Sequence, residues 1–268
     1  HEVITSSLHN HCNLCDGKDS PEEMAAAAFR AGITDFGFSS HSYASFDMGA
    51  SVKDERDYIE KIKSVIKNND LPVNLYLGTE EDLFCPVAFR EEYDYIIGSV
   101  HYVERKGKIY AVDISGKVLS RCIDESFSFS PAAFYRAYFE NMVECARKKP
   151  DILGHFDIIR LCGGGIIDFC SRDYTDAAIG CIDECLNYGV IVEVNYGGVA
   201  RGKVKSPYPD EFLLKRILEK NGRVTVTNDC HDAKFIAYGL NSGEQYLKSL
   251  GFKSVTVMKN GKFVEQSI

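Results

Sequence analysis

The sequence contains neither a long apolar run nor an excess of positive charge. No apolar segment is long enough to cross a bilayer, and the N-terminus lacks the pattern of a signal peptide. We therefore expect a cytoplasmic protein without a membrane partner. Lys and Arg number 31 against 39 Asp and Glu, which gives a formal net charge of −8. This balance disfavours a protein that binds long nucleic acids, but it allows a small anionic substrate, because bound metal ions can reverse the local field.

Linkers, internal repeats and a disulfide framework are also missing. No segment rich in Pro, or in Gly and Ser, divides the chain, so we predict a single domain over residues 1–268. The ten cysteines are not needed as cross-links, since a chain of this length can bury an apolar core. Cys12-Asn13-Leu14-Cys15 is an isolated CxxC motif without a second pair at zinc-ribbon spacing. A separate zinc or redox role for it is therefore the less favoured interpretation.

Short apolar runs alternate with longer amphipathic segments, which is typical of a βα-repeating fold. Strands are predicted at residues 3–8, 34–38, 73–77, 95–99, 152–154, 190–194 and 223–227. Helices are predicted at residues 21–31, 52–67, 131–148, 173–187, 209–220 and 242–250. Asn260-Gly261 predicts a C-terminal β-hairpin, whereas residues 104–129 lack a clear period and are expected to form a long excursion. The predicted fold is an α/β barrel of the TIM type with seven strands, one fewer than usual.

Six of the seven histidines occur in short polar clusters, and each cluster follows a predicted strand. Three carboxylates lie in equivalent places. In a βα barrel the carboxyl ends of the strands meet on one rim, so residues far apart in sequence form one pocket there. The set that we expect on this rim is His9, His11, Asp16, His41, Glu80, His101, His155, Asp229 and His231.

These residue types indicate a metal centre, because imidazole is the commonest metal ligand among side chains. His9-x-His11 and Asp229-x-His231 each direct two ligands to the same side, since side chains alternate along an extended segment. Nine ligands are too many for one ion, so we expect two or three divalent transition metals, namely zinc, iron or manganese. Three such ions and three carboxylates leave a charge of about +3, which a hydroxide and a phosphate-monoester dianion would balance. The predicted chemistry is therefore hydrolysis of a small phosphate ester.

The polar clusters form short motifs in a fixed order along the chain. They are His9-x-His11, Asp16-Gly17, Ser40-His41, Gly78-x-Glu80, Gly98-Ser99-Val100-His101, Gly154-His155 and Asp229-x-His231. These ordered motifs resemble those of the polymerase-and-histidinol-phosphatase (PHP) superfamily. The resemblance runs from about residue 5 to residue 233, and within the superfamily the chain is most similar to the histidinol-phosphate phosphatase family. The segments Asp94–His101 and Gly154–Arg160 carry the closer similarity.

This resemblance implies a distorted seven-stranded barrel with a trinuclear site. By matching positions, one metal would be held by His9, His11, Glu80 and Asp229. Glu80 would bridge to a second metal held by His101 and His155. The third metal would be held by Asp16, His41 and His231. The implied activity is hydrolysis of L-histidinol phosphate to L-histidinol and phosphate, a step of histidine biosynthesis.

In the mechanism that we expect, a metal-bridging hydroxide attacks phosphorus, and Glu80, Asp229 and His231 organise it as ligands. Arg160 and Arg201 are the candidates for binding the phosphate, because a guanidinium suits bidentate phosphate contacts. One of the acids Glu81 and Asp82 could meet a substrate ammonium, although a solvated or ligand-orienting role is favoured.

Two other functions stay open on sequence grounds. One is a phosphoesterase of the same superfamily that acts on nucleotides or oligonucleotides, and the other is a non-catalytic metal-binding module. The sequence does not decide the oligomeric state.

Overall fold

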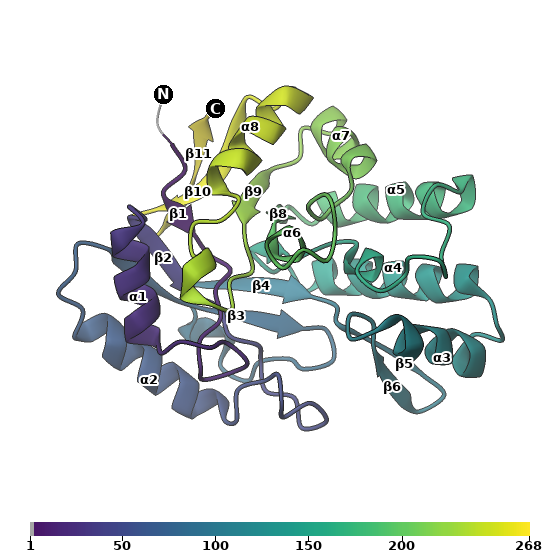
Figure 1. Ribbon diagram of the computed structural model, residues 1–268, viewed down its shortest axis with the longest axis horizontal. Helices are drawn as coiled ribbons and strands as arrows, with labels where there is room; N and C mark the ends of the chain where they lie inside the picture. The colour runs from purple at the N-terminus through teal and green to yellow at the C-terminus, as the bar shows by residue number, and fades with distance from the viewer. Residues whose placement is uncertain (1–2) are drawn as a thin grey trace.

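Seven parallel strands form the central sheet of the computed structural model, which describes residues 3–268 (Figure 1). The first two residues of the predicted domain therefore lie outside the described part of the chain. The strands are β1 (Ser6–Ser7), β2 (Asp35–Phe38), β3 (Asn74–Asp82), β4 (Tyr95–Ser99), β7 (Ile152–Leu153), β8 (Ile191–Asn195) and β9 (Val224–Thr227). They neighbour one another in chain order, and every pair within the sheet is parallel.

The sheet curls until its first and last strands approach each other. Beyond the ends of β1 and β9, Asn10 and Cys230 form an isolated parallel bridge. His11 N donates to Cys230 O at 2.8 Å, and Cys230 N donates to His9 O at 3.0 Å. The predicted seven-stranded, TIM-like barrel is therefore confirmed, and it is nearly closed at the end where β1 and β9 finish.

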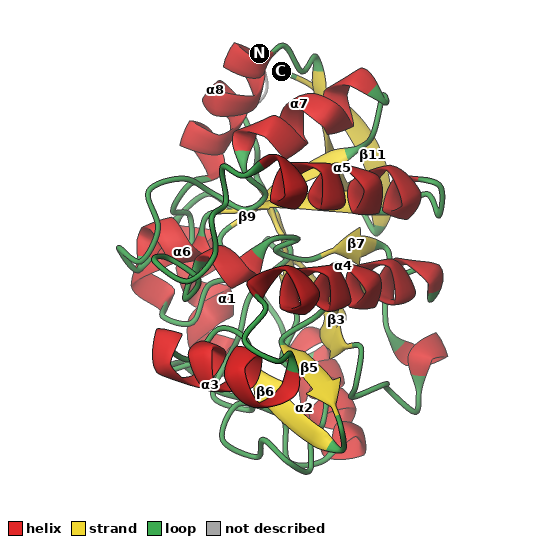
Figure 2. Ribbon diagram, turned by 90° about the vertical axis from the view of Figure 1, so that its right-hand side faces the viewer, coloured by secondary structure: helices red, strands yellow, loops and turns green. Residues whose placement is uncertain are grey.

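Helices cover the outside of the barrel, as the predicted βα alternation requires. They are α1 (Pro21–Arg30), α2 (Glu55–Lys67), α4 (Pro131–Arg147), α5 (Arg172–Leu186), α7 (Glu211–Glu219) and α8 (Leu240–Leu250). The four-residue helix α6 (Gly197–Ala200) instead follows β8 directly and lies beside Asp229. Figure 2 shows α4 and α5 side by side along one flank, with α7 next to α5. Between β3 and β4 only the short 3₁₀ turn Arg90–Glu92 replaces a helix, so this βα unit is incomplete. Further 3₁₀ turns lie at Ile158–Arg160 and Ala233–Phe235.

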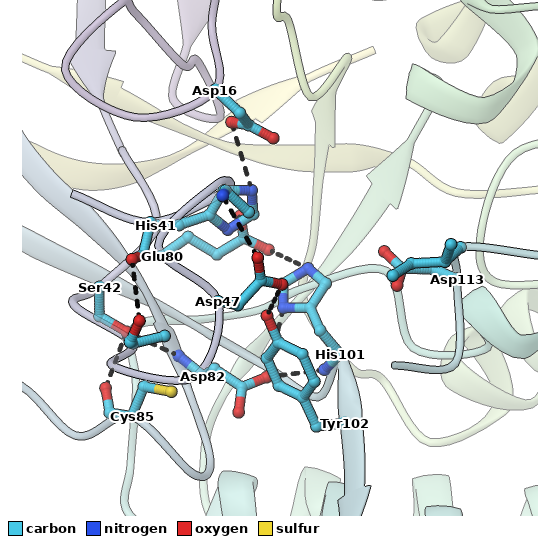
Figure 3. Close-up of a pocket in the computed structure, with 14 residues that line it drawn as sticks. Asp16, His41, Ser42, Asp47, Glu80, Asp82, Cys85, His101, Tyr102 and Asp113 are labelled. Carbon is cyan, nitrogen blue, oxygen red and sulfur yellow. Dashed lines mark hydrogen bonds and ion pairs between the residues drawn. The ribbon is translucent and has the colours of Figure 1, made fainter. Parts of the chain in front are cut away.

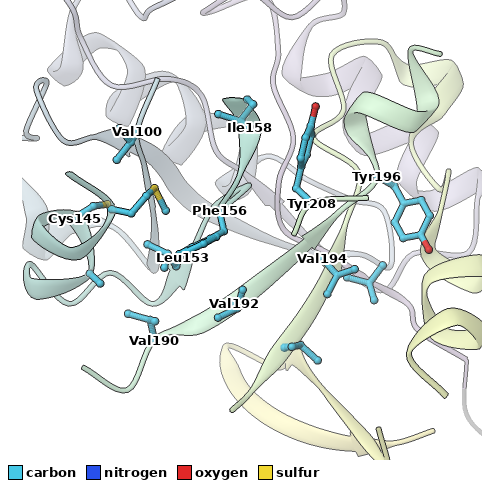
Figure 4. Packing of buried hydrophobic residues seen from close by; sticks show 14 of the residues in the cluster. Val100, Cys145, Leu153, Phe156, Ile158, Val190, Val192, Val194, Tyr196 and Tyr208 are labelled. Carbon is cyan, nitrogen blue, oxygen red and sulfur yellow. The ribbon is translucent and has the colours of Figure 1, made fainter. Parts of the chain in front are cut away.

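The apolar core lies between the strands and these helices. Leu153, Val192 and Val194 point from neighbouring strands into this layer, where Cys145 of α4 packs (Figure 4). A smaller cluster fills the barrel interior, and Tyr95 crosses it to donate a hydrogen bond to Leu8 O. A Cβ atom at Gly37 or Gly78 would lie within 2.3 Å of the Tyr95 side chain, so the ring fits only because both positions are glycine.

The C-terminal hairpin closes the amino end of the barrel. Strands β10 (Ser254–Lys259) and β11 (Lys262–Ser267) pair around Asn260-Gly261, as the sequence predicts. Met258 N donates to Ser6 Oγ at 3.1 Å, and Gly261 N donates to the Tyr76 hydroxyl at 2.9 Å. The opposite end, where the strands finish, is thus the one left for a site.

The expected excursion is more regular than its sequence indicates. It contains the antiparallel strands β5 (Tyr102–Arg105) and β6 (Lys108–Ala111), followed by helix α3 (Gly116–Ser126). Its hairpin is too short for a periodicity argument, whereas Leu119, Cys122, Ile123 and Ser126 of α3 are buried at helical spacing, a signal that the sequence analysis missed. Across residues 3–268, no helix combines the length and apolarity that crossing a membrane requires.

Candidate metal centre

The nine predicted ligands converge at the carboxyl end of the barrel. Glu80 lies within β3, which extends five residues further than predicted, to Asp82. Because side chains alternate along a strand, Glu80 shares the inward face with Gly78, two residues before it. The Tyr95 ring occupies the space beside Gly78, and Glu80 forms the next layer above that ring.

The Glu80 carboxylate is the centre of the cluster, and it is 1 % exposed. Five imidazoles surround its two oxygens. Oε2 lies 3.1 Å from His9 Nε2, 3.3 Å from His11 Nε2 and 3.0 Å from His41 Nδ1. Oε1 lies 2.8 Å from His155 Nε2 and 3.2 Å from His101 Nε2. One carboxylate thus contacts ligands contributed by loops after four different strands.

Asp229 and Asp16 join the remaining ligands to this group. Asp229 Oδ1 lies 3.2 Å from His11 Nε2 and 3.5 Å from His231 Nδ1. Asp16 Oδ1 lies 3.3 Å from His231 Nε2 and 3.6 Å from His41 Nε2. The structure therefore brings all nine predicted residues together. Three overlapping groups have the spacing to hold an ion: His9 with His11 and Glu80; His41 with Glu80 and His101; and His11 with Asp16, His41 and His231.

Four buried ligand atoms lack a hydrogen-bond partner and have the spacing expected of metal ligands. His9 Nε2, His11 Nε2, Glu80 Oε2 and Asp229 Oδ1 have no hydrogen-bond partner among the described residues. The measured separations between these nitrogens and oxygens are 3.1–3.5 Å. A tetrahedral ion with bonds of about 2.0–2.1 Å holds its ligands about 3.3–3.4 Å apart. The chemistry and spacing of this set therefore match a divalent metal.

The electrostatics of the cluster also favour a cation at its centre. Burial disfavours a charged imidazole, but the carboxylates of Glu193, Glu80 and Asp229 raise the pKa of His9 well above 6.5. Conversely, although burial opposes ionisation, the neighbouring imidazoles hold the pKa values of Glu80 and Asp229 well below their usual range. Ionised carboxylates buried this deeply need positive charge beside them, as protons on the imidazoles or as metal ions.

Glu193 is a functional residue that the sequence analysis did not select. It is fully buried, and His9 Nδ1 donates a hydrogen bond to its Oε1, which also accepts from Thr227 Oγ1 at 2.6 Å. Its Oε2 accepts from the backbone N–H of His155 at 2.7 Å. Glu193 therefore fixes the orientation of one ligand ring and the backbone of a second. The available signal was a lone acid inside the apolar strand β8.

The carboxylates of Asp82 and Glu81 both interact with other groups of the protein. Asp82 Oδ2 accepts from His101 N at 2.7 Å and lies 3.3 Å from His101 Nδ1, so Asp82 orients that ligand. Glu81 pairs with Arg90 at 2.8 Å and accepts from Val87 N at 2.9 Å. Among the roles considered for these acids, the structure favours ligand orientation for Asp82. It pairs Glu81 with Arg90 instead.

The CxxC motif lies next to the cluster. Cys15 Sγ is 3.5 Å from His11 Nδ1, and Cys12 Sγ is 3.6 Å from Ser40 Oγ. Burial raises the pKa of Cys15 to about 12 and also raises the pKa of Cys12. Both groups are therefore thiols near neutral pH in the metal-free protein.

The two predicted phosphate-binding arginines lie in different settings. Arg160 is 11 % exposed, and its guanidinium donates to Pro207 O at 2.9 Å and to Ser206 Oγ at 2.7 Å. It also pairs with buried Asp157 at 3.4 Å. Arg201 is 36 % exposed, lies 3.8 Å from Asp229 Oδ2, and faces the open end of the cluster. The structure thus brings Arg201 to the cluster, whereas Arg160 is occupied by loop contacts.

Two adjoining cavities open onto the cluster and share Asp16, His41, His101, Asp113 and Ile114. The first, which we call the acidic cavity, has a volume of about 250 Å³, and its carboxylates are Asp16, Asp47, Glu80, Asp82 and Asp113 (Figure 3). The second, which we call the mixed-charge cavity, has a volume of about 520 Å³ and is lined by Arg201 and Lys203 together with Asp16, Asp113 and Asp229. No Lys or Arg lines the acidic cavity within the described part of the chain.

The fold and the cluster define the class of the molecule. It is a TIM-like barrel that carries a cluster of imidazole and carboxylate side chains, spaced to hold metal ions, at the carboxyl ends of its strands. The family model for the PHP domain matches residues 7–197, and the chain belongs to this family.

Similar proteins extend the match over most of the chain. A Schizosaccharomyces pombe protein named "Probable histidinol-phosphatase" is 21 % identical, over 95 % of this chain and 90 % of that protein. A Listeria monocytogenes structure proposed to be a histidinol phosphatase has a TM-score of 0.75 at 16 % identity, covering 88 % of this chain and 98 % of its own. The Lactococcus lactis histidinol phosphate phosphatase, complexed with zinc, L-histidinol and phosphate, has a TM-score of 0.69 at 17 % identity, covering 96 % and 98 %. These structural likenesses confirm the fold.

Proposed function

We propose that this chain is a metal-dependent phosphatase that hydrolyses L-histidinol phosphate to L-histidinol and phosphate. The observation that carries the proposal is the convergence of nine imidazole and carboxylate ligands beside a cavity containing Arg201 and Lys203. The names of the similar proteins support the choice of substrate. We further propose a cytoplasmic location and two or three zinc, iron or manganese ions, held by His9, His11, Asp16, His41, Glu80, His101, His155, Asp229 and His231.

Divalent ions bound there would supply Lewis acidity, which lowers the pKa of water and offsets negative charge on the phosphoryl group. The residues of the chain hold the reacting groups in place. Glu80 is shared between two of the ligand groups, so it fixes their separation, while Asp229 and His231 define the side that faces the mixed-charge cavity. Arg201 and Lys203 provide positive charge for the phosphoryl oxygens.

Phosphate release from a substrate panel tests this proposal. The panel contains histidinol phosphate, AMP and a dinucleotide, each assayed with zinc, iron or manganese added. We expect kcat/KM for histidinol phosphate to exceed the other values by at least about tenfold, because one set of charged contacts is worth this much. A preference for AMP or the dinucleotide would instead indicate a phosphoesterase that acts on nucleotides or oligonucleotides. If the metal-bound protein hydrolyses no member of the panel, the result would indicate a non-catalytic metal-binding module.

Metal analysis provides an independent measurement. Protein purified without chelator should contain two to three equivalents of transition metal per chain. A metal-free preparation that retains full phosphatase activity would contradict the proposal.

A further inference from the structure

The imidazole of His11 is supported by a sulfur atom. Its Nε2 atom faces the acids of the cluster, at 3.3 Å from Glu80 Oε2 and 3.2 Å from Asp229 Oδ1. A histidine that binds a metal through one ring nitrogen carries a proton on the other, and this proton needs an acceptor. Cys15 Sγ lies 3.5 Å from His11 Nδ1, within the range for a hydrogen bond to sulfur. The thiol of Cys15 is therefore the partner that the structure gives to this ring.

Other histidines of the cluster direct their second ring nitrogen to oxygen. The oxygen comes from Glu193 for His9, from Asp82 for His101 and from the backbone carbonyl of Asp229 for His231. Asp16 Oδ1 lies 3.7 Å from His11 Nδ1, which is too far for a hydrogen bond. A thiol is a neutral and weaker acceptor than a carboxylate. The support of His11 therefore depends on how firmly the chain holds Cys15.

A tight turn holds Cys15 against the His11 ring. Cys15 N and Gly17 N both donate to Cys12 O at 3.0 Å, so residues 12–17 fold back on themselves. A Cβ atom at Gly17 would lie 2.5 Å from Cys12 N, so the turn requires glycine there. The Cys15 thiol donates to the same carbonyl oxygen at 3.4 Å. Its hydrogen is thus directed at the backbone, and a sulfur lone pair is left to accept from His11 Nδ1.

The same turn places the next proposed ligand. Asp16 follows Cys15 directly, and its Oδ1 lies 3.3 Å from His231 Nε2. Lys18 N donates to His231 O at 2.9 Å, which joins the end of the turn to the loop after β9. Cys15 therefore lies between the ring of one proposed ligand and the carboxylate of another.

We propose that Cys15 is a positioning residue of the metal centre, whose thiol accepts the Nδ1 proton of His11 and so directs Nε2 toward Glu80 and Asp229. This inference rests on the metal binding contained in the proposed function. It gives the CxxC motif a role that requires neither a disulfide nor a thiolate ligand. Because Cys15 acts through His11, its replacement should lower metal affinity without removing a ligand.

Three substitutions of Cys15 separate hydrogen bonding from packing. Cys15→Ser keeps a side chain that accepts from His11 and donates to Cys12 O. Cys15→Val fills the space but makes neither bond, and Cys15→Ala does neither. We expect the serine variant to bind zinc about as tightly as wild-type protein. The valine and alanine variants should each lose about tenfold in affinity, the lower end of the usual range for a partner of a metal-bound histidine.

Competition with a chromogenic chelator measures these affinities. Cys122→Ala is the matched control, since it removes another buried thiol, on α3, which packs in the apolar core. It should lower the free energy of unfolding and leave zinc affinity unchanged. Tighter zinc binding by Cys15→Val than by Cys15→Ser would overturn the inference, because it would mean that Cys15 only fills space.

Nitrogen-15 NMR of the histidine rings provides a second readout that is independent of turnover. In zinc-loaded wild-type protein and in Cys15→Ser, the His11 Nδ1 proton should exchange slowly with water. In Cys15→Val it should exchange about tenfold faster, since the loss of one hydrogen bond changes an opening equilibrium by about this factor. Metal binding by wild-type protein, with equal affinity and equal exchange in every Cys15 variant, would overturn this inference alone. A wild-type protein that binds no metal would refute the proposed function, and this inference with it.

Discussion

The floor of the site and its rim are built in different ways. The floor, defined as the nine proposed ligands, comes from β3 and from the loops directly after the other strands. His9 and His11 are fully buried, and their ring nitrogens contact neighbouring side chains. The rim, defined as Asp47, Asp113, Arg201 and Lys203, comes from longer loops. There Arg201 is 36 % exposed, and Asp113 has no partner in the described chain.

Because of this difference, we expect floor residues to govern catalysis and rim residues to govern substrate specificity. Each floor residue contacts several others, so one substitution disturbs the whole cluster. Rim residues contact few neighbours, and their replacement should change which substrate binds without unfolding the barrel. The following predictions test that separation, beginning with the largest effect.

Glu80→Gln should produce the largest loss, because Glu80 contacts five imidazoles. We expect at least about a 10³-fold decrease in kcat/KM, since bound metals supply several kcal/mol of charge stabilisation. Metal content should fall in parallel, as measured by elemental analysis. Glu81→Gln, which changes the adjacent acid facing Arg90, should keep its metals. A Glu80→Gln protein with full metal content and activity would refute the central role of this carboxylate.

Arg160→Ala should affect stability rather than substrate affinity. Removal of the guanidinium leaves Asp157, which is fully buried, without its charged partner, so we expect a loss of about 3 kcal/mol in the free energy of unfolding. Denaturant titration measures this loss. Arg201→Ala is the matched rim variant, and it should raise KM with less than about 0.5 kcal/mol of destabilisation. A large KM increase in Arg160→Ala at unchanged stability would support the phosphate role predicted from sequence.

The floor could be predicted from sequence because its residues lie at or just after the ends of parallel strands. Parallel strands end at the same rim, so a His or an acid at the end of a strand is a candidate for the cluster. His9-x-His11 needed only the two-residue alternation of an extended chain, and the structure directs both Nε2 atoms to Glu80 Oε2. Glu193 requires a different signal, since it is an acid inside the apolar strand β8.

The rim could not be predicted because its contacts depend on tertiary structure. Asp113 follows the β5–β6 hairpin, whose two-residue loop Lys106-Gly107 is a weaker hairpin signal than Asn-Gly or Asp-Gly. Arg160 contacts Ser206 and Pro207, which lie nearly fifty residues further along the chain. No local pattern at Arg160 distinguishes a phosphate ligand from a loop anchor.

Glu193→Gln should weaken metal binding without removing a ligand. The variant replaces the anionic acceptor of His9 Nδ1 by an amide, which makes the ring a poorer electron donor. We expect a 10- to 100-fold lower metal affinity, a typical effect for a partner of a metal-bound histidine. Competition with a chromogenic chelator measures it. Glu211→Gln, which changes an exposed carboxylate on α7, is the control. Equal affinities in the two variants would show that Glu193 acts only on folding.

The metal-free protein should lose stability as the pH rises above 6.5. The carboxylates around His9 and His101, and Asp16 beside His231, raise these three pKa values despite burial. The native state therefore retains protons that the unfolded chain releases near pH 6.5. The resulting stability is complete below that value and is lost as pH rises through the raised pKa values.

The expected loss is about 1.4 kcal/mol per pH unit for each retained proton. His11 does not offset this loss, because burial and neighbouring imidazoles lower its pKa, and its contribution is complete above pH 6.5. Thermal unfolding from pH 6.5 to 9 measures the trend in chelator-treated protein. Metal-loaded protein is the control and should lack the decline, because bound cations replace the protons at the floor. A metal-free protein that gains stability over this range would mean that the floor carboxylates do not control the imidazoles.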